Sequence, residues 1–389
     1  MLTIGYDVEV ALGRHGLTQA LSGIERQAMN KQRLITELQS YGLRVEESTP
    51  GAAGRRGGAG PSDHRAITID GTTVMVPVYT DSAARSPYTI RATAASPLHL
   101  EASGEAVTPI DVPNAPKFYG LTTADGTPYW KIALLHGRDV LATTVQQTCM
   151  RYRDPATACQ FCAIEKSLDA GRTIARKTPQ QLAEVAEAAV RLDGVTHMIM
   201  TTGTPNTSDR GAAYLTECAA AIRQRVNLPI QAQCEPPDDF AWFSRMKAAG
   251  IDSLGMHLEA VDPDVRAKIM PGKAEVPLTV YYQAFEAAVN VFGWGQVSTY
   301  LLAGLGDSLE TLVEASDRLI NLGVYPFVVP FVPIGETPLA HHPTPSSEFM
   351  FTLYQHVGAL LKQSGLASAD MKAGCAKCGA CSALSTFES

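Results

Sequence analysis

Six of the eight cysteines in this 389-residue chain fall into two short triplets. The first triplet lies in the segment CMRYRDPATACQFC, and the second lies in GCAKCGACSAL, close to residue 389. Their members are Cys149, Cys159 and Cys162 in the first, and Cys375, Cys378 and Cys381 in the second. Eight cysteines are too few for a disulfide framework in a chain of this length, so the clustering indicates metal ligation.

The first triplet is typical of an iron–sulfur cluster with one open position. Its three thiolates have no further cysteine or histidine nearby, which leaves a tetrahedral zinc site incomplete. A [4Fe–4S] cluster takes one ligand per iron, so three cysteines leave one iron open for a small molecule. An aromatic residue, Phe161, precedes the last cysteine. A zinc loop or a set of buried thiols remains the alternative.

The second triplet has the spacing C-x2-C-x2-C between small residues. This spacing lets three thiolates turn inward around one cluster, and the fourth ligand is again absent locally. We therefore expect a second [4Fe–4S] cluster here. The alternatives are a zinc knuckle completed by a distant histidine, or a mobile tail with free thiols.

The elements that position the first triplet follow from a strict alternation of strand and helix patterns after residue 140. Thr178, Pro179 and Gln181 give a clear start signal for the first helix. We expect strands at 140–145, 198–202, 229–233, 253–258, 296–303 and 327–332, separated by amphipathic helices at 180–192, 212–225, 239–249, 279–292 and 309–322. Six such units predict a parallel α/β sheet, curled into a partial (β/α)6 TIM-type barrel. Cys149 follows the first strand, at the end where such barrels carry their chemistry.

The first third of the chain has a different pattern of predicted secondary structure. Residues 27–41 show helical periodicity, and the Gly-rich segment 51–61 has the composition of a mobile loop. Asp70-Gly71 and Asp125-Gly126 each predict a β-hairpin. We expect an α+β domain at 1–135, the barrel at 136–345, and a helix with a short cysteine-rich extension at 346–389.

Composition excludes several classes of protein. The 32 basic and 39 acidic residues give a net charge of −7, which argues against nucleic acid as a partner. No apolar run approaches the roughly 20 residues of a membrane span. Asp7 and Glu9 stand where a signal peptide would be apolar, so we expect a cytoplasmic protein.

The first triplet resembles that of the radical S-adenosylmethionine (SAM) superfamily, whose usual spacing is C-x3-C-x-aromatic-C. Here the spacing is C-x9-C-x-Phe-C, so the last two cysteines and Phe161 match while the first gap is six residues longer. We expect the additional residues, Arg151 and Arg153 among them, to bulge away from the cluster. The resemblance implies that the three cysteines hold a [4Fe–4S] cluster that binds SAM.

Other strand ends extend this resemblance over about residues 140–345. The turn Thr202-Gly203-Thr204 is similar to the segment that contacts the SAM amino group. GIDSLGMHLEA resembles the ribose-binding segment of biotin and lipoyl synthases, which implies that His257 and Glu259 hold the ribose, although His257 replaces an asparagine and could be a core histidine. STYLLAGLGDSLET resembles the segment of those synthases that passes the adenine, with Gly304 and Gly306 permitting the approach. VVPFVPIGETPL resembles their sixth strand.

The third predicted strand is followed by Cys234 and Glu235. Cys234 is interpreted as a buried thiol, and Glu235 as a contact of SAM or substrate. The whole architecture, tail included, resembles the radical SAM family encoded beside nitrilases in bacterial gene clusters for cyanide assimilation. The resemblance implies a 5′-deoxyadenosyl radical acting on a small organic substrate, with a low-potential electron donor such as flavodoxin or ferredoxin. The rival hypothesis is a non-catalytic zinc-binding or redox-sensing protein that uses both triplets.

Overall fold

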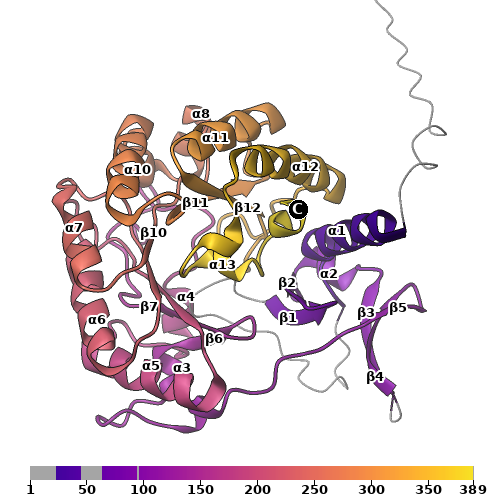
Figure 1. Ribbon diagram of the computed structural model, residues 1–389, viewed down its shortest axis with the longest axis horizontal. Coiled ribbons are helices and arrows are strands. Elements are labelled where there is room, and N and C mark those ends of the chain that lie inside the picture. Colours follow the sequence, from indigo (N-terminus) through magenta and orange to yellow (C-terminus); the bar gives the residue numbers. More distant parts are fainter. Residues whose placement is uncertain (1–22, 45–63, 94–95, 389) are drawn as a thin grey trace, which may run out of the picture.

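The computed structural model describes residues 23–44, 64–93 and 96–388. Its main feature is a seven-stranded sheet in the order β12-β11-β10-β9-β8-β7-β6, curled into a partial barrel (Figure 1). The strands are β6 (Leu134–His136), β7 (Val140–Thr144), β8 (His197–Thr201), β9 (Ile230–Gln233), β10 (Ser253–Gly255), β11 (Val297–Ala303) and β12 (Val324–Pro330). All neighbours pair in parallel except β6, which pairs antiparallel with β7. The six predicted parallel strands and the partial TIM-type barrel are confirmed.

Helices cover the outer face of this sheet (Figure 1). The longer ones are α5 (Pro179–Asp193), α6 (Ala212–Arg225), α7 (Ala241–Ala248), α10 (Leu278–Phe292), α11 (Leu309–Asn321) and α12 (Ser347–Ser364). Shorter turns of helix are α4 (Lys166–Asp169), α8 (Pro263–Ile269) and α9 (Pro271–Ala274). Thr178 caps α5 in a capping box with Gln181, as predicted. The strands are buried on both faces because the helices cover one side and the barrel interior the other.

In the described residues, the first part of the chain forms one long helix, three short helical turns and two small sheets beside the barrel. Its elements are α1 (Gly23–Tyr41), β1 (His64–Ile69), β2 (Thr72–Pro77), α2 (Asp81–Ala84), β3 (Tyr88–Thr93), β4 (Ser96–Ala102), β5 (Glu105–Pro109), η1 (Lys117–Gly120) and α3 (Tyr129–Ile132). The hairpin predicted at Asp70-Gly71 joins β1 to β2, and both turn residues have positive φ, as a two-residue hairpin turn requires. The segment 51–61, expected to be a mobile loop, lies outside the described residues.

The second predicted hairpin, at Asp125-Gly126, is wrong. A turn forms there, but it is held by a single bridge between Thr122 and Pro128, and helical turns flank it. Asp125 accepts hydrogen bonds from Thr123 within the turn and from Gln181 on α5. The turn is therefore closed by its own backbone hydrogen bonds and by contacts with α5, and no strand of the described residues extends from it.

The last segment crosses the amino ends of the barrel strands. It contains η2 (Ser368–Asp370), α13 (Cys375–Cys378) and η3 (Leu384–Phe387). Ser253, the first residue of β10, donates to Ala373 O at 2.8 Å, and Gln296, just before β11, donates to Asp370 O at 3.0 Å. This segment, residues 368–387, forms a floor at the amino ends of the strands, whereas the first triplet follows the carboxyl end of β7. No helix in the described ranges is long and apolar enough to cross a membrane.

Candidate active site

The first cysteine triplet lies on the loop that follows β7, at the carboxyl end of the sheet, with all three thiols partly buried. Burial raises the pKa of Cys162 to about 12, and burial followed by the charge of Glu259 raises that of Cys159. These thiols therefore stay protonated unless positive charge arrives. Cluster irons would supply that charge, so the donor set fits thiolate ligation of a cluster.

The six additional residues of this loop point in two directions. Arg153 is 79% exposed and pairs with Glu165, which agrees with the expected outward bulge. Arg151 differs: its side chain is buried and forms an ion pair with Glu235. Burying a guanidinium requires a paired carboxylate, and Glu235 supplies one beneath the loop. Part of the insertion is thus built into the site.

The turn Thr202-Gly203-Thr204 supports the cysteine loop from below. A Cβ on Gly203 would lie 2.2 Å from the carbonyl oxygen of Thr148, so only glycine fits against the residue that precedes Cys149. The loop returns a hydrogen bond from Met150 N to Thr204 O at 2.9 Å. The turn and the first cysteine are therefore held in one fixed relation.

Glu235 carries an unsatisfied acceptor. Its Oε1 accepts from the Thr204 hydroxyl at 2.5 Å and from Arg151. Its Oε2 is buried and has no hydrogen-bond partner in the part of the chain that the structure describes. Leaving a charged acceptor buried without a partner is costly, so this oxygen fits a ligand donor such as the SAM ammonium group.

Glu259 occupies a strained backbone position beside the same loop. Its φ is 65°, in the left-handed region, and Lys273 Nζ donates to its Oε2 at 2.9 Å. Burial alone would lower the pKa of Lys273, but Glu259 and further neighbours raise it above its ordinary value, so the ammonium keeps its charge. Strain of this kind persists where the surroundings fix a side chain for function.

Lys273 is a residue that the sequence did not single out. It follows Gly272, where a Cβ would lie 2.6 Å from the carbonyl oxygen of Thr157 in the cysteine loop. Gln160 N also donates to Ile269 O at 2.8 Å. The Pro-Gly-Lys segment after α8 was the available signal, since it interrupts a helical pattern directly before a cation.

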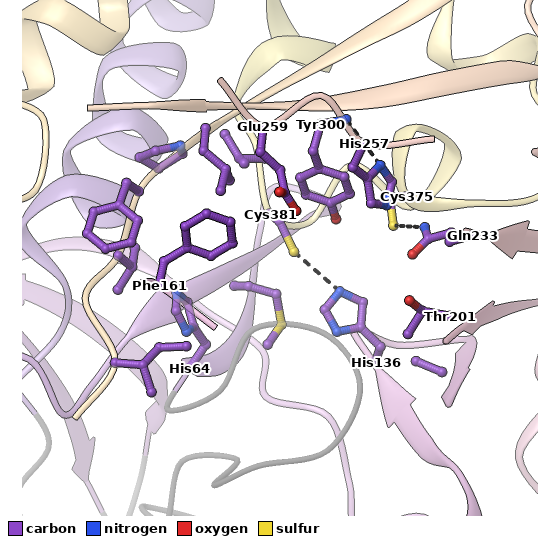
Figure 2. Close-up of a pocket in the computed structure, with 18 of the residues that line it drawn as sticks. His64, His136, Phe161, Thr201, Gln233, His257, Glu259, Tyr300, Cys375 and Cys381 are labelled. Atoms are coloured by element: carbon purple, nitrogen blue, oxygen red, sulfur yellow. Dashed lines mark hydrogen bonds between the residues drawn. The ribbon is translucent and has the colours of Figure 1, made fainter. Parts of the chain in front are cut away.

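A cavity of about 350 Å³ runs from this loop into the barrel (Figure 2). Phe161, His257 and Glu259 line it, and so do Cys375 and Cys381 from the floor. Of the two triplets, only Cys375 and Cys381 line this space; Cys149, Cys159, Cys162 and Cys378 lie outside its lining, and Phe161 represents the cysteine loop there. Thr202, Gly203, Thr204, Glu235 and Gly304 lie outside its lining; Gly304, with φ 105°, packs against Pro345, and its carbonyl oxygen lies 2.8 Å from His342 Nε2.

His257 is a lining residue with a fixed tautomer. Its Nδ1 accepts from Tyr300 N at 3.2 Å, which places the remaining ring hydrogen on Nε2. Burial, with the charge of Lys273, lowers the pKa of His257 to about 3. The ring is therefore a neutral donor at the cavity wall.

The second triplet reaches the cavity from the floor. Gln233 Nε2 donates to Cys375 Sγ at 3.1 Å, and Cys381 Sγ lies 3.5 Å from His136 Nε2. Burial and the neighbouring thiol of Cys375 hold the pKa of Tyr300 well above its ordinary value, so its hydroxyl keeps its proton. Within the described ranges no three His, Cys, Asp or Glu side chains converge on one point as a bound metal ion requires. Loading either triplet therefore requires the thiols to turn inward.

Three further lining residues, missed by the sequence analysis, come from the first part of the chain: Gln39, His64 and Met75. Met75 N donates to Ala380 O at 2.7 Å, and Gln39 Nε2 donates to the same oxygen at 3.3 Å. The first part of the chain and the floor therefore close the cavity together. Cys218 and Cys234 are buried, as expected of thiols that pack in a core.

Part of the chain is similar to a known superfamily. The model of the radical SAM superfamily matches residues 149–319. Bacteriochlorophyllide c C-7(1)-hydroxylase of Chlorobaculum limnaeum is 26% identical over 256 residues, which cover 61% of this chain and 63% of that protein's length.

Two solved structures are similar to part of this chain at low sequence identity. Methylornithine synthase is 17% identical, covers 57% of this chain and 61% of its own, and has a TM-score of 0.45. A radical SAM methyltransferase from Sphaerobacter thermophilus is 17% identical, covers 71% and 75%, and has a TM-score of 0.44. The superfamily match begins at Cys149 and spans the strand ends described above, so the similarity to radical SAM enzymes covers residues 149–319.

Proposed function

We propose that the chain cleaves SAM reductively and uses the resulting radical to abstract hydrogen from a small substrate in the barrel cavity. A [4Fe–4S] cluster held by Cys149, Cys159 and Cys162 would supply the electron that splits SAM into methionine and a 5′-deoxyadenosyl radical. The observation that carries the proposal is the buried, unpartnered Oε2 of Glu235 beneath the cysteine loop.

The protein's own contribution is to hold SAM in one orientation. Glu235 Oε2 would accept from the ammonium group, beside the Thr202–Thr204 turn. Glu259, fixed by Lys273, would accept from the ribose hydroxyls, and the neutral His257 would donate to them. Gly304 and Gly306, both at positive φ, let this segment pack against Pro345 and Val265, and the segment would pass the adenine.

The cavity suits a small organic substrate. Its volume lies in the range of small-molecule sites, and its walls include Ile199, Leu302 and Val329 with a few polar groups. The resemblance to the family encoded beside nitrilases supports a role in nitrile- or cyanide-linked nitrogen metabolism. Apolar walls also exclude water from a reactive radical. A flavodoxin or ferredoxin would be the electron donor.

We further propose that Cys375, Cys378 and Cys381 hold a second [4Fe–4S] cluster at the floor. Anaerobically reconstituted protein would then carry about eight irons, four per cluster. A triple alanine variant of these cysteines should keep about four and still cleave SAM slowly. If the variant keeps its full iron content, the floor triplet holds no cluster.

Metal and isotope analysis tests the proposed reaction. Iron with sulfide is expected after anaerobic preparation, whereas zinc without sulfide would favour the non-catalytic alternative. Deuterated small molecules, nitriles among them, should be offered with SAM and a low-potential reductant. The substrate is the one whose deuterium appears in 5′-deoxyadenosine. If SAM is not cleaved with any low-potential reductant, the proposed reaction is contradicted.

A further inference from the structure

The turn between β6 and β7 faces the floor triplet. His136, the last residue of β6, is buried and lines the cavity, with its Nε2 3.5 Å from Cys381 Sγ (Figure 2). The next residue, Gly137, lies against Cys378: a Cβ built on it would be 3.9 Å from that sulfur. Two consecutive residues of this turn therefore border two of the three thiols.

The third thiol shares the same space. Cys375 lines the cavity with His136 and Cys381, and Gln233 and the Tyr300 hydroxyl hold it there. Its backbone N–H is fixed by Gln231 Oε1 at 3.2 Å. The three sulfurs and one imidazole nitrogen are thus brought to one buried region by chain segments 239 or more residues apart.

We propose that His136 is the fourth protein ligand of the floor cluster, through Nε2. The inference rests on the proposed second cluster and adds the ligand that the C-x2-C-x2-C segment lacks. A cluster with four protein ligands has no open iron, so the floor site would transfer electrons rather than bind substrate. Histidine ligation also raises the potential relative to an all-cysteine cluster of the same type. The oxidised floor cluster would then take one electron from the substrate radical, which would lose a proton to become a closed-shell product, and the reduced cluster would return the electron to the external electron carrier.

The test isolates the floor cluster in the full-length chain. A background variant with Cys149, Cys159 and Cys162 changed to alanine removes the loop cluster, so the remaining iron, about four per chain, belongs to the floor. The background protein is prepared with histidine labelled in 15N, reconstituted anaerobically and reduced. Pulsed EPR then reports nitrogen coupled to the cluster. His136→Cys, which offers a thiolate in place of the imidazole, is compared with His64→Ala, a second buried histidine of the same cavity.

We expect strong coupling to a 15N-histidine nitrogen in the background protein and in His64→Ala. His136→Cys should retain about four irons and lose that coupling. A reduced cluster without histidine coupling, or coupling that persists in His136→Cys, would overturn the assignment of His136. A background protein that binds no iron would instead overturn the second cluster itself, so the two failures are distinguishable. Zinc in place of iron at this site would also overturn the second cluster.

Discussion

At the scale of single residues, the proposed SAM site depends on one buried carboxylate, Glu235. Glu235→Gln keeps the shape of the side chain but removes the charge that would pair with the SAM ammonium group. A hydrogen bond to a charged group contributes about 1.5–3 kcal/mol, so the Kd for SAM should rise roughly 10- to 100-fold. Equilibrium binding under anaerobic conditions measures the change.

Glu165→Gln is the matched control. Glu165 is also buried and also pairs with an arginine of the cysteine loop, but its partner Arg153 faces outward. Its Kd for SAM should stay within about twofold of wild type. If Glu235→Gln behaves like this control, Glu235 does not hold SAM.

A second prediction at the residue scale concerns Gly203 and the iron content of the cysteine loop. A methyl group there would lie 2.2 Å from the carbonyl oxygen of Thr148, so Gly203→Ala must displace the backbone that leads into Cys149. Such overpacking costs about 1–3 kcal/mol, and the iron bound at the loop should fall below the wild-type content. Gly120→Ala, which meets no atom within 4 Å, should keep full iron content. Equal iron in both variants would contradict the role given to Gly203.

At the scale of elements, β8 begins with a buried histidine whose protonation opposes folding. Burial lowers the pKa of His197 to about 4, below its ordinary value near 6.5. The unfolded chain therefore binds more protons between pH 6.5 and 4, and stability falls as the pH drops through this range. Between pH 7.5 and 5 the unfolding free energy of wild type should fall, and that of His197→Gln should fall by about 1–2 kcal/mol less.

Denaturant titrations at the two pH values measure this difference. His356→Gln, on the exposed face of α12, should leave the pH dependence unchanged. If the unfolding free energy of His197→Gln falls as much between the two pH values as that of wild type, the His197 imidazole is not the group responsible.

The sequence predicted those elements whose signal is local. Strands such as β8 and β11 contain apolar runs, Thr178, Pro179 and Gln181 specify the α5 cap, and the Asp70-Gly71 turn depends only on its own φ angles. Asp125-Gly126 has the same turn signal, but helical turns flank it in place of strands, and the turn packs on α5. His64, His136 and Lys273 could not be placed, because each joins the site through contacts between distant segments. Phe161, His257 and Glu259 were found because their strand ends carry a recognisable pattern.

At the scale of the whole molecule, three parts of the chain close one cavity. The barrel supplies the cysteine loop and the walls, the segment 368–387 supplies the floor, and the first part of the chain adds Gln39, His64 and Met75. Ala380 O, which accepts from both Met75 N and Gln39, joins the last two parts. A radical formed at the loop would thus face a space bounded by all three.

The most direct test of the account is the amount of 5′-deoxyadenosine formed from SAM by the reduced, iron-loaded protein under anaerobic conditions. Wild type should form it, and alanine at Cys149, Cys159 or Cys162 should abolish it, while alanine at the buried Cys218 should not. Formation that survives loss of any one of the three loop cysteines, or its absence from wild type carrying a full complement of iron and sulfide, would contradict the account.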